Sequence, residues 1–551
     1  MRPAVITAAA LSCVIIALGS PAHAQVQSAP GPDLEAALVS IAPSGAGCVA
    51  GLALSGAAPK IVARGQADLE HAAPLTPATI IETGSLAKQF TAAAVVLLAQ
   101  DGKLSLDDDI RRVLPEMPDY GAPITIRHLL THTSGLREQW SLMALTGNGP
   151  GAQVHTNAMI LDLASRQKGL NFAPGSEFLY TNTNYVLAAL IVERVSGTSL
   201  QAFTHQRLFQ PLGMGHTQWR EDFRTVVPGR AIAYAPTEAG FVANMPFTNV
   251  YGNGGLLTTI GDLLLWNAFL DKPSALATAL QTPGRLNTGA PLDYGLGLEI
   301  TRDHGRRLVS HSGSTAGYKT WLGRYPDEGV SIALMCNNGG VDPVALGEGI
   351  AARGLAAAGH APAQAAVSAP KAVAAAQAPK DLTPYQGLFR DPVSGDLVRL
   401  AAVGGQLILT RASSQALTPL GHNRFQTADG GVIAFPRQGA GAAGFDLTRA
   451  GVTRAFVAVR PAADATTLAD YVGTYYSAEL DTLITVARQG DALVMRQRFA
   501  VEWPLAPSFA DAFTTRLRGV TTFVFARDAQ GKVTGFGAWA GGARNVAFVR
   551  R

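Results

Sequence analysis

The sequence predicts a mixed α/β (α+β) domain followed by two small antiparallel β-barrel-like domains. Three observations predict this: a long region with both strand and helix patterns, an Ala/Pro-rich stretch behind it, and an internal repeat in the remainder. The 551 residues are too many for one domain. Hydrophobic residues make up 47% and charged residues 15%, which is typical of a folded protein.

The first domain is expected over residues 30–355. Apolar strand-like runs lie at its two ends, at 48–54 and 330–336, and helix-like patterns fill the middle, as at 90–100 and 185–195. A sheet built from both ends of the region, with helices packed on it, explains this order.

The linker is expected over residues 356–380, where Ala and Pro dominate and large apolar residues are rare. Such a composition cannot build a core. An Ala-rich helix is the alternative, but the repeated prolines argue against a long one.

Two β units follow, expected at 381–460 and 466–551, where short segments alternate apolar and polar residues between turn signals. Four positions of the first unit recur in the second at a constant offset: Leu382, Tyr385, Gly387 and Phe389 match Leu468, Tyr471, Gly473 and Tyr475. We interpret the repeat as two tandem barrels, because closure removes exposed sheet edges.

The N-terminus has the pattern of a signal peptide over residues 1–24. Arg2 precedes an apolar run at 4–18, and small residues at Ala22 and Ala24 predict cleavage after Ala24. A retained membrane anchor is the alternative, but the run is short for a span of about 20 residues. We therefore expect a periplasmic or secreted protein without stable membrane insertion.

The cysteine content leaves one question open. Cys13 lies in the expected signal peptide, while Cys48 and Cys336 lie in apolar strand-like runs. They are either two buried free thiols or a disulfide, which an oxidising compartment would permit.

The net charge of the chain limits the classes of partner that it can bind. The formal net charge is +4, and no dense Lys/Arg run occurs. We therefore expect no nucleic-acid partner.

The first chemical motif is Ser85-Leu86-Ala87-Lys88, directly before an apolar helical run at 91–98. A spacing of three residues puts Ser85 and Lys88 on one helix face, where the amine can activate the hydroxyl. Other Ser-x-x-Lys patterns start at Ser165 and Ser368, so the pattern alone is weak, and taken in isolation N-capping explains Ser85 better than catalysis does.

The second motif is Tyr180-Thr181-Asn182, on a loop before the helical pattern at 185–195. A nearby lysine would lower the pKa of Tyr180 and make it a usable base, and Asn182 could bind a substrate amide. Tyr251-Gly252-Asn253 has the same spacing.

The third motif is His311-Ser312-Gly313-Ser314, expected between strand-like runs at 307–310 and 319–325. Small residues here let a substrate lie against a strand edge. The backbone N–H of Ser314 could form an oxyanion hole with that of Ser85.

The order of these motifs resembles the serine β-lactamase and penicillin-binding protein superfamily, in its class C-like branch, over residues 33–349. Further stretches share the resemblance: residues 126–136, 211–214, 254–256 and 294–297. The resemblance implies a β-lactamase/transpeptidase-like fold, with an antiparallel sheet flanked by helices and an all-helical lobe.

The resemblance also implies roles. Ser85 would be acylated, Lys88 would assist proton removal, and Tyr180 would be the general base or proton shuttle. Asn182, His311, Gly313 and Ser314 would bind the substrate and its oxyanion.

His311 stands where the β-lactamase pattern has the lysine of Lys-Thr-Gly. The loss of that fixed charge should weaken recognition of a substrate carboxylate. A histidine at this position resembles the D-aminopeptidase and esterase members more closely, and the two trailing β domains resemble the D-aminopeptidase layout.

The sequence therefore predicts a serine hydrolase that forms an acyl-enzyme and cleaves small amides or esters, with D-amino acid amides or peptides as the first substrate class. A β-lactamase or D-alanyl-D-alanine carboxypeptidase is the alternative, and a catalytically inactive cell-wall-binding module is the second alternative. The trailing β domains are expected either to contact the cell wall or to cover the site.

No cofactor or metal is expected. His128 and His132 have the spacing of zinc ligands on a helix, but Leu129 stands where the zinc-protease motif needs a glutamate.

Overall fold

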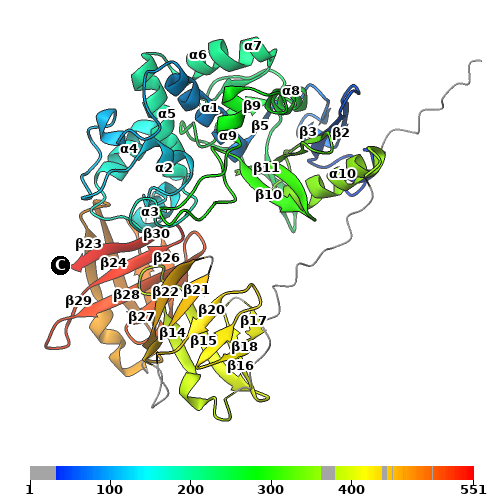
Figure 1. Cartoon of the computed structure of the whole chain (residues 1–551). Helices are drawn as coiled ribbons and strands as arrows, with labels where there is room; N and C mark the ends of the chain where they lie inside the picture. Colours follow the sequence, from blue (N-terminus) through cyan, green and yellow to red (C-terminus); the bar gives the residue numbers. More distant parts are fainter. Residues whose placement is uncertain are drawn as a thin grey trace, which may run out of the picture.

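A computed structural model describes residues 33–149, 151–360, 379–411, 413–436, 443–449, 451–462, 465–498 and 501–551. The expected signal peptide and most of the expected linker lie outside these residues. The first domain forms one end of the molecule, and the two β domains lie together at the other (Figure 1).

The first domain is built on a six-stranded sheet in the order β10-β11-β12-β13-β1-β2. Every adjacent pair is antiparallel, and the first and last parts of the domain meet where β1 pairs with β13. The strands are β1 (Cys48–Leu54), β2 (Lys60–Arg64), β10 (Glu299–Asp303), β11 (Arg306–Thr315), β12 (Tyr318–Tyr325) and β13 (Val330–Cys336).

Helices cover both faces of this sheet. Neighbouring residues of β1 point to opposite sides, as a strand requires: Val49 packs with α8 in one core, and Ala50 packs with α10 in another. The helices are α1 (Ala87–Gln100), α2 (Ile126–Leu130), α3 (Gln139–Thr146), α4 (Asn157–Ser165), α5 (Asn182–Ser196), α6 (Leu200–Thr204), α7 (Gln210–Leu212), α8 (Ile260–Leu270), α9 (Ala275–Leu280) and α10 (Pro343–Ala357), with short turns η1 (Ala36–Leu38), η2 (Gly84–Leu86), η3 (Ile110–Arg112) and η4 (His205–Phe209).

Three small sheets complete the domain, and one of them leads into the site. It has the order β5-β9-β6, and β5 ends three residues before Ser85. The strands are β3 (Gln66–Asp68), β4 (Ala73–Pro74), β5 (Ile81–Glu82), β6 (Gln218–Trp219), β7 (Tyr234–Thr237), β8 (Gly240–Ala243) and β9 (Leu256–Thr258).

The second domain is a nine-stranded antiparallel sheet that curls into a nearly closed barrel. Its end strands, β17 and β18, are separated in sequence only by Leu417, so the two free edges lie near each other. After the turn η5 (Thr383–Tyr385), the strands are β14 (Gly387–Arg390), β15 (Leu397–Val403), β16 (Gln406–Thr410), β17 (Ser414–Ala416), β18 (Thr418–Gly421), β19 (Arg424–Gln426), β20 (Val432–Ala434), β21 (Gly444–Arg449) and β22 (Val452–Val459).

The third domain is a closed eight-stranded barrel, so its sheet has no free edge. It begins with η6 (Ala465–Tyr471), and its strands are β23 (Gly473–Ser477), β24 (Thr482–Gln489), β25 (Ala492–Arg496), β26 (Glu502–Phe509), β27 (Ala512–Arg516), β28 (Val520–Arg527), β29 (Val533–Ala540) and β30 (Ala543–Arg550). Its apolar core includes Leu142 and Leu145 of α3 and Ile160 of α4, so it is continuous with the first domain.

The structure decides between the two interpretations of the cysteines. Cys48 and Cys336 face each other across β1 and β13 and form a disulfide, with the sulfur atoms 2.09 Å apart. The bond links the first strand of the domain to the last strand of its sheet.

One expected boundary, between the first domain and the linker, changes. Helix α10 continues to Ala357 and so includes the first two residues of the expected linker.

Among the described residues, no single helix has the length and apolar composition to cross a membrane, although Asn182–Ser196 and Leu200–Leu212, bent by 78°, pass that test as a pair.

Candidate active site

Ser85 lies in the tight turn η2, between β5 and helix α1. Gly84 makes this turn possible, because its φ of +55° is one that side chains rarely adopt. N–H groups at the start of a helix have no acceptor within it, so the N–H of Ser85 is available to a ligand.

Lys88 is fully buried one turn later and points back at Ser85. Its Nζ donates to Ser85 Oγ at 3.0 Å, to Asn182 Oδ1 at 2.9 Å and to the carbonyl of Asn253 at 2.7 Å. Burial lowers the pKa of Lys88 to about 7, and the charge of Glu138 opposes this shift. A substantial neutral fraction of this amine is therefore present at neutral pH.

Asn182 is the first residue of α5 and connects Lys88 to a buried carboxylate. Its Nδ2 donates to Glu138 Oε1 at 3.0 Å. The other oxygen of Glu138 accepts from the backbone N–H of Ser141 and caps α3. These contacts fix the Asn182 amide with its oxygen toward Lys88.

Tyr180 lies beside Lys88, but not in the state that the sequence predicts. The Lys88 Nζ is 4.9 Å from the Tyr180 ring centre, yet burial raises the pKa of Tyr180 well above its usual value, and a contact with Ser85 opposes this only in part. Desolvation outweighs the nearby amine, so the expectation of a lowered pKa is wrong. Tyr180 stays neutral, and its hydroxyl has no hydrogen-bond partner among the described residues.

His132 packs against Tyr180, with ring centres 4.2 Å apart. It is not on a helix with His128, as the sequence spacing suggested, because α2 ends at Leu130 and His132 has a φ of +57°. Its Nδ1 accepts from the backbone N–H of Thr181. His132 thus holds the Tyr180 loop in place.

His311 lies inside strand β11 rather than between two strands, because the pairing of β11 with β12 continues through Thr315. Its Nδ1 donates to the carbonyl of Ser312 at 2.6 Å, and its Nε2 accepts from the hydroxyl of Tyr294 at 3.1 Å. Burial and the charge of Lys88 lower the pKa of His311 to about 4. The imidazole is neutral at neutral pH.

Strand β11 touches the Ser85 turn directly. A Cβ on Gly313 would lie 2.0 Å from the carbonyl oxygen of Thr83 and 3.2 Å from the Ser85 nitrogen, and a Cβ on Gly84 would lie 2.7 Å from the Ser314 nitrogen. Only glycines permit this approach. Beyond Ser310, β11 has no partner in β10, so the edge that carries His311 to Thr315 is open to a substrate.

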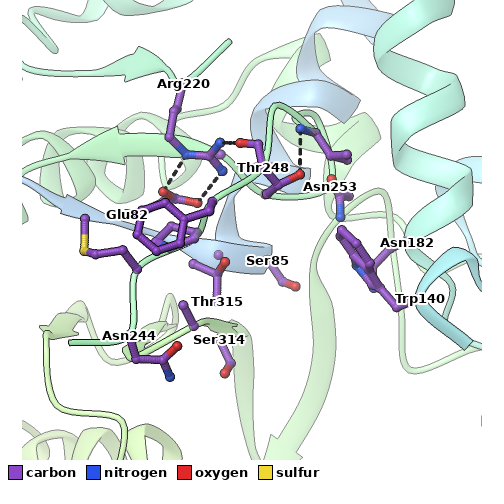
Figure 2. A pocket seen from close by; sticks show the side chains of 18 of the residues that line it. Glu82, Ser85, Trp140, Asn182, Arg220, Asn244, Thr248, Asn253, Ser314 and Thr315 are labelled. Carbon is purple, nitrogen blue, oxygen red and sulfur yellow. Dashed lines mark hydrogen bonds and ion pairs between the residues drawn. The ribbon is translucent and has the colours of Figure 1, made fainter. Parts of the chain in front are cut away.

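Two cavities meet at Ser85. The first, which we call the Asn182 cavity, has a volume of about 530 Å³ and is also lined by Trp140, Asn244 and Ser314. Figure 2 shows it, with Ser314 and Thr315 on one side of Ser85 and Asn182 and Trp140 on the other.

The second, which we call the Tyr180 cavity, has a volume of about 870 Å³. It is lined by Ser85, His311, Tyr294 and Phe178 as well as Tyr180. The two cavities give a bound substrate two different environments on the two sides of the serine.

A cation does lie beside the third motif, although His311 replaces the lysine there. Lys319 on β12 is paired with Ser314 on β11, and its Nζ donates to Ser314 Oγ at 2.9 Å. Lys319 also lines the Tyr180 cavity. Sequence reasoning missed it because only the pairing of β11 and β12 brings it to the motif.

Sequence reasoning missed other contacts as well. Asn253 belongs to the other Tyr-x-Asn pattern, for which the sequence predicted no role, yet its carbonyl accepts a hydrogen bond from Lys88. Glu138 belongs to none of the motifs recognised in the sequence. A single sequence could not show the contact of either residue, because each contact forms only when distant segments of the chain come together.

Away from Ser85, the described part of the chain contains a group of three residues that could hold a cation. Ligand atoms of Asp68, Glu70 and His71 lie within 4.8 Å of one another, and His71 Nδ1 is 2.7 Å from Asp68 Oδ2. None of the three lines either cavity.

Comparison with known proteins identifies the family. Residues 46–357 match the family model described as Beta-lactamase, which is more than half of the chain. This chain belongs to the beta-lactamase family. Its fold and its relatives make it a serine hydrolase.

The curated relatives include two kinds of hydrolase. Penicillin-binding protein 4* of Bacillus subtilis is 32% identical over 296 residues, which is 50% of this chain and 64% of that protein. The D-aminopeptidase of Brucella canis is 26% identical over 514 residues, which is 88% of this chain and 92% of that protein. The second match includes the trailing β domains.

Among solved structures, the crystal structure of SurE superposes with a TM-score of 0.52 at 23% identity. It covers 75% of this chain and 94% of its own. This similarity supports the fold.

Proposed function

We propose that this protein hydrolyses amide bonds in small D-amino acid amides or peptides through an acyl-enzyme on Ser85. The contact between the buried Lys88 amine and Ser85 Oγ, at 3.0 Å, carries the proposal. The D-configured substrate class is supported by the D-aminopeptidase relative, which matches nearly the whole chain.

In the acylation step, the neutral Lys88 amine takes the hydroxyl proton of Ser85 as Oγ attacks the carbonyl carbon. The N–H groups of Ser85 and Ser314 stabilise the oxyanion. Tyr180 donates its proton to the departing amine and recovers one from the Lys88 ammonium. Water then attacks the acyl carbon of the acyl-enzyme, and Tyr180 and Lys88 pass the water proton back to Ser85 Oγ in the reverse order. The carboxylic acid is released and Ser85 is free again.

The cation beside the third motif is Lys319 on the neighbouring strand, and not the neutral imidazole of His311. Its Nδ1–H and Nε2 both have partners within the protein, so it shapes the Tyr180 cavity rather than pairing with a carboxylate. Carboxylic esters would react by the same steps and are the second substrate class.

We propose a periplasmic or secreted location. The disulfide between Cys48 and Cys336 supports an oxidising compartment, in agreement with the signal-peptide pattern expected at residues 1–24.

The test is turnover of D- and L-amino acid p-nitroanilides, p-nitrophenyl esters and nitrocefin by the purified protein. We expect the D-anilides to be cleaved, and Ser85→Ala to abolish both cleavage and labelling by a fluorophosphonate. Preference for L-anilides, or full labelling of Ser85→Ala, would contradict the proposal.

A further inference from the structure

The two cavities at Ser85 can be assigned to the two halves of a substrate. Tyr180, the proton donor to the departing amine, lines only the Tyr180 cavity. Asn182 lines only the Asn182 cavity. The leaving group therefore lies in the Tyr180 cavity, and the acyl group lies in the Asn182 cavity.

One wall of the Asn182 cavity comes from the third domain. Arg518 lies in the turn between β27 and β28 of the barrel, and it lines this cavity together with Ser85 and Trp140. The barrel is held here by a core that it shares with α3 and by a buried ion pair between Arg137 and Glu479. The interface thus holds the barrel, and with it the hairpin that carries Arg518, against the first domain.

The other charged residues that line the Asn182 cavity are already paired with each other. Glu82 is fully buried, and both of its carboxylate oxygens accept from Arg220 at 2.9 and 3.0 Å. Figure 2 shows this pair at one side of the cavity. Arg230 also contacts Glu82 at 3.3 Å. This cluster offers no unpaired carboxylate to a cationic substrate.

Arg518 is different, because within the described part of the chain its guanidinium makes no ion pair or hydrogen bond. It is exposed to solvent, and an arginine is charged at any physiological pH. A guanidinium facing an acyl pocket attracts an anionic group and can bind a carboxylate through two parallel hydrogen bonds.

We propose that Arg518 selects substrates whose acyl group carries a carboxylate, such as acidic D-amino acid amides. This inference rests on the proposed function, since it assigns the acyl group of the same reaction. Arg518 is a specificity residue, and the barrel supplies part of the substrate site.

The experiment compares kcat/KM for D-aspartic acid p-nitroanilide with that for D-asparagine p-nitroanilide, which differ in charge and hardly in shape. We expect the wild-type protein to prefer the aspartate substrate by roughly fivefold, the effect of an exposed ion pair. Arg518→Gln should remove the preference, and Arg518→Glu should reverse it. The preference should also weaken as salt rises.

Arg516→Gln is the matched control, because Arg516 is exposed on β27 of the same hairpin and lines neither cavity. It should leave the ratio unchanged. Equal rates on the two substrates, or an unchanged ratio in Arg518→Gln, would overturn the inference and leave the proposed function standing. No turnover of any D-anilide would overturn both.

Discussion

At the residue scale, the chemistry depends on the burial of Lys88. An exposed lysine is almost wholly protonated at neutral pH and cannot accept a proton. Here burial lowers its pKa to about 7, and its three contacts are with oxygen atoms, of which none belongs to a carboxylate. Glu138 influences it only across the intervening Asn182 amide.

The pH dependence of activity follows from this pKa. Below about 7 the Lys88 amine is protonated and cannot take the Ser85 proton, so kcat/KM should fall tenfold per pH unit. The titration of His311 should not change kcat/KM near neutral pH, because the pKa of His311 lies at about 4. The pH profile of p-nitroanilide cleavage measures both.

Glu138→Gln tests the direction in which the acid limb of the pH profile moves. The charge of Glu138 raises the pKa of Lys88, so its removal should move the acid limb of the profile to lower pH. Glu238→Gln, at an exposed position, is the control. An acid limb that stays in place in Glu138→Gln would show that another group controls it.

At the scale of elements, the site is the contact between strand β11 and turn η2. The hydroxyl of Thr320 on β12 donates to the carbonyl of Thr83 at 2.7 Å, and Gly313 lets the strand approach the same carbonyl. The proposed oxyanion hole takes one N–H group from each side of this contact, that of Ser85 from η2 and that of Ser314 from β11.

Gly313→Ala tests this contact. The added Cβ would lie 2.0 Å from the carbonyl oxygen of Thr83, so strand and turn must separate and the oxyanion hole must widen. We expect a loss of about 100-fold or more in kcat, the effect of losing one oxyanion donor, with the protein still folded by circular dichroism.

Gly261→Ala is the control for that substitution, because a Cβ there would meet only the Thr259 hydroxyl at 3.8 Å. It lies in helix α8, where alanine is favoured over glycine. A Gly313→Ala enzyme as active as Gly261→Ala would contradict the proposed oxyanion hole.

At the scale of the whole molecule, the third domain is part of the enzyme rather than an appendage. Arg137 and Glu479 are both buried at the interface, and the Arg137 guanidinium also donates to the carbonyls of Arg544 and Asn545 at 3.1 Å. The backbone N–H of the next residue, Glu138, donates to the carbonyl of Gly542. The interface therefore lies beside the network that holds Asn182 and Lys88.

Arg137→Ala should destabilise the protein by about 3–5 kcal/mol, because it leaves the Glu479 carboxylate buried without its partner. Urea unfolding followed by fluorescence measures this. Arg127→Ala, which breaks an exposed ion pair with Asp107, should cost less than about 1 kcal/mol. Equal effects of the two substitutions would show that the interface pair is not important for stability.

Much of the architecture could be predicted because it depends on local patterns. The runs at 48–54 and 330–336 coincide with β1 and β13, and the repeat in the last third corresponds to the two barrels. The three candidate motifs could be recognised by their order, and the fold brings them together at Ser85. The protonation states could not be predicted, since they depend on how completely the fold excludes water from Lys88, Tyr180 and His311.

By itself, the sequence determined the fold class through its periodicity and its internal repeat, and its resemblance to known motifs indicated the family and the candidate residues Ser85, Lys88, Tyr180 and Asn182. Only the tertiary structure decided that Cys48 and Cys336 are bonded, that Tyr180 stays neutral, and that Arg518 from the last domain lines the Asn182 cavity. The physical reason is the same in each case. Burial and contacts between distant segments set the charge and the partners of a side chain, and neither is present in a linear chain.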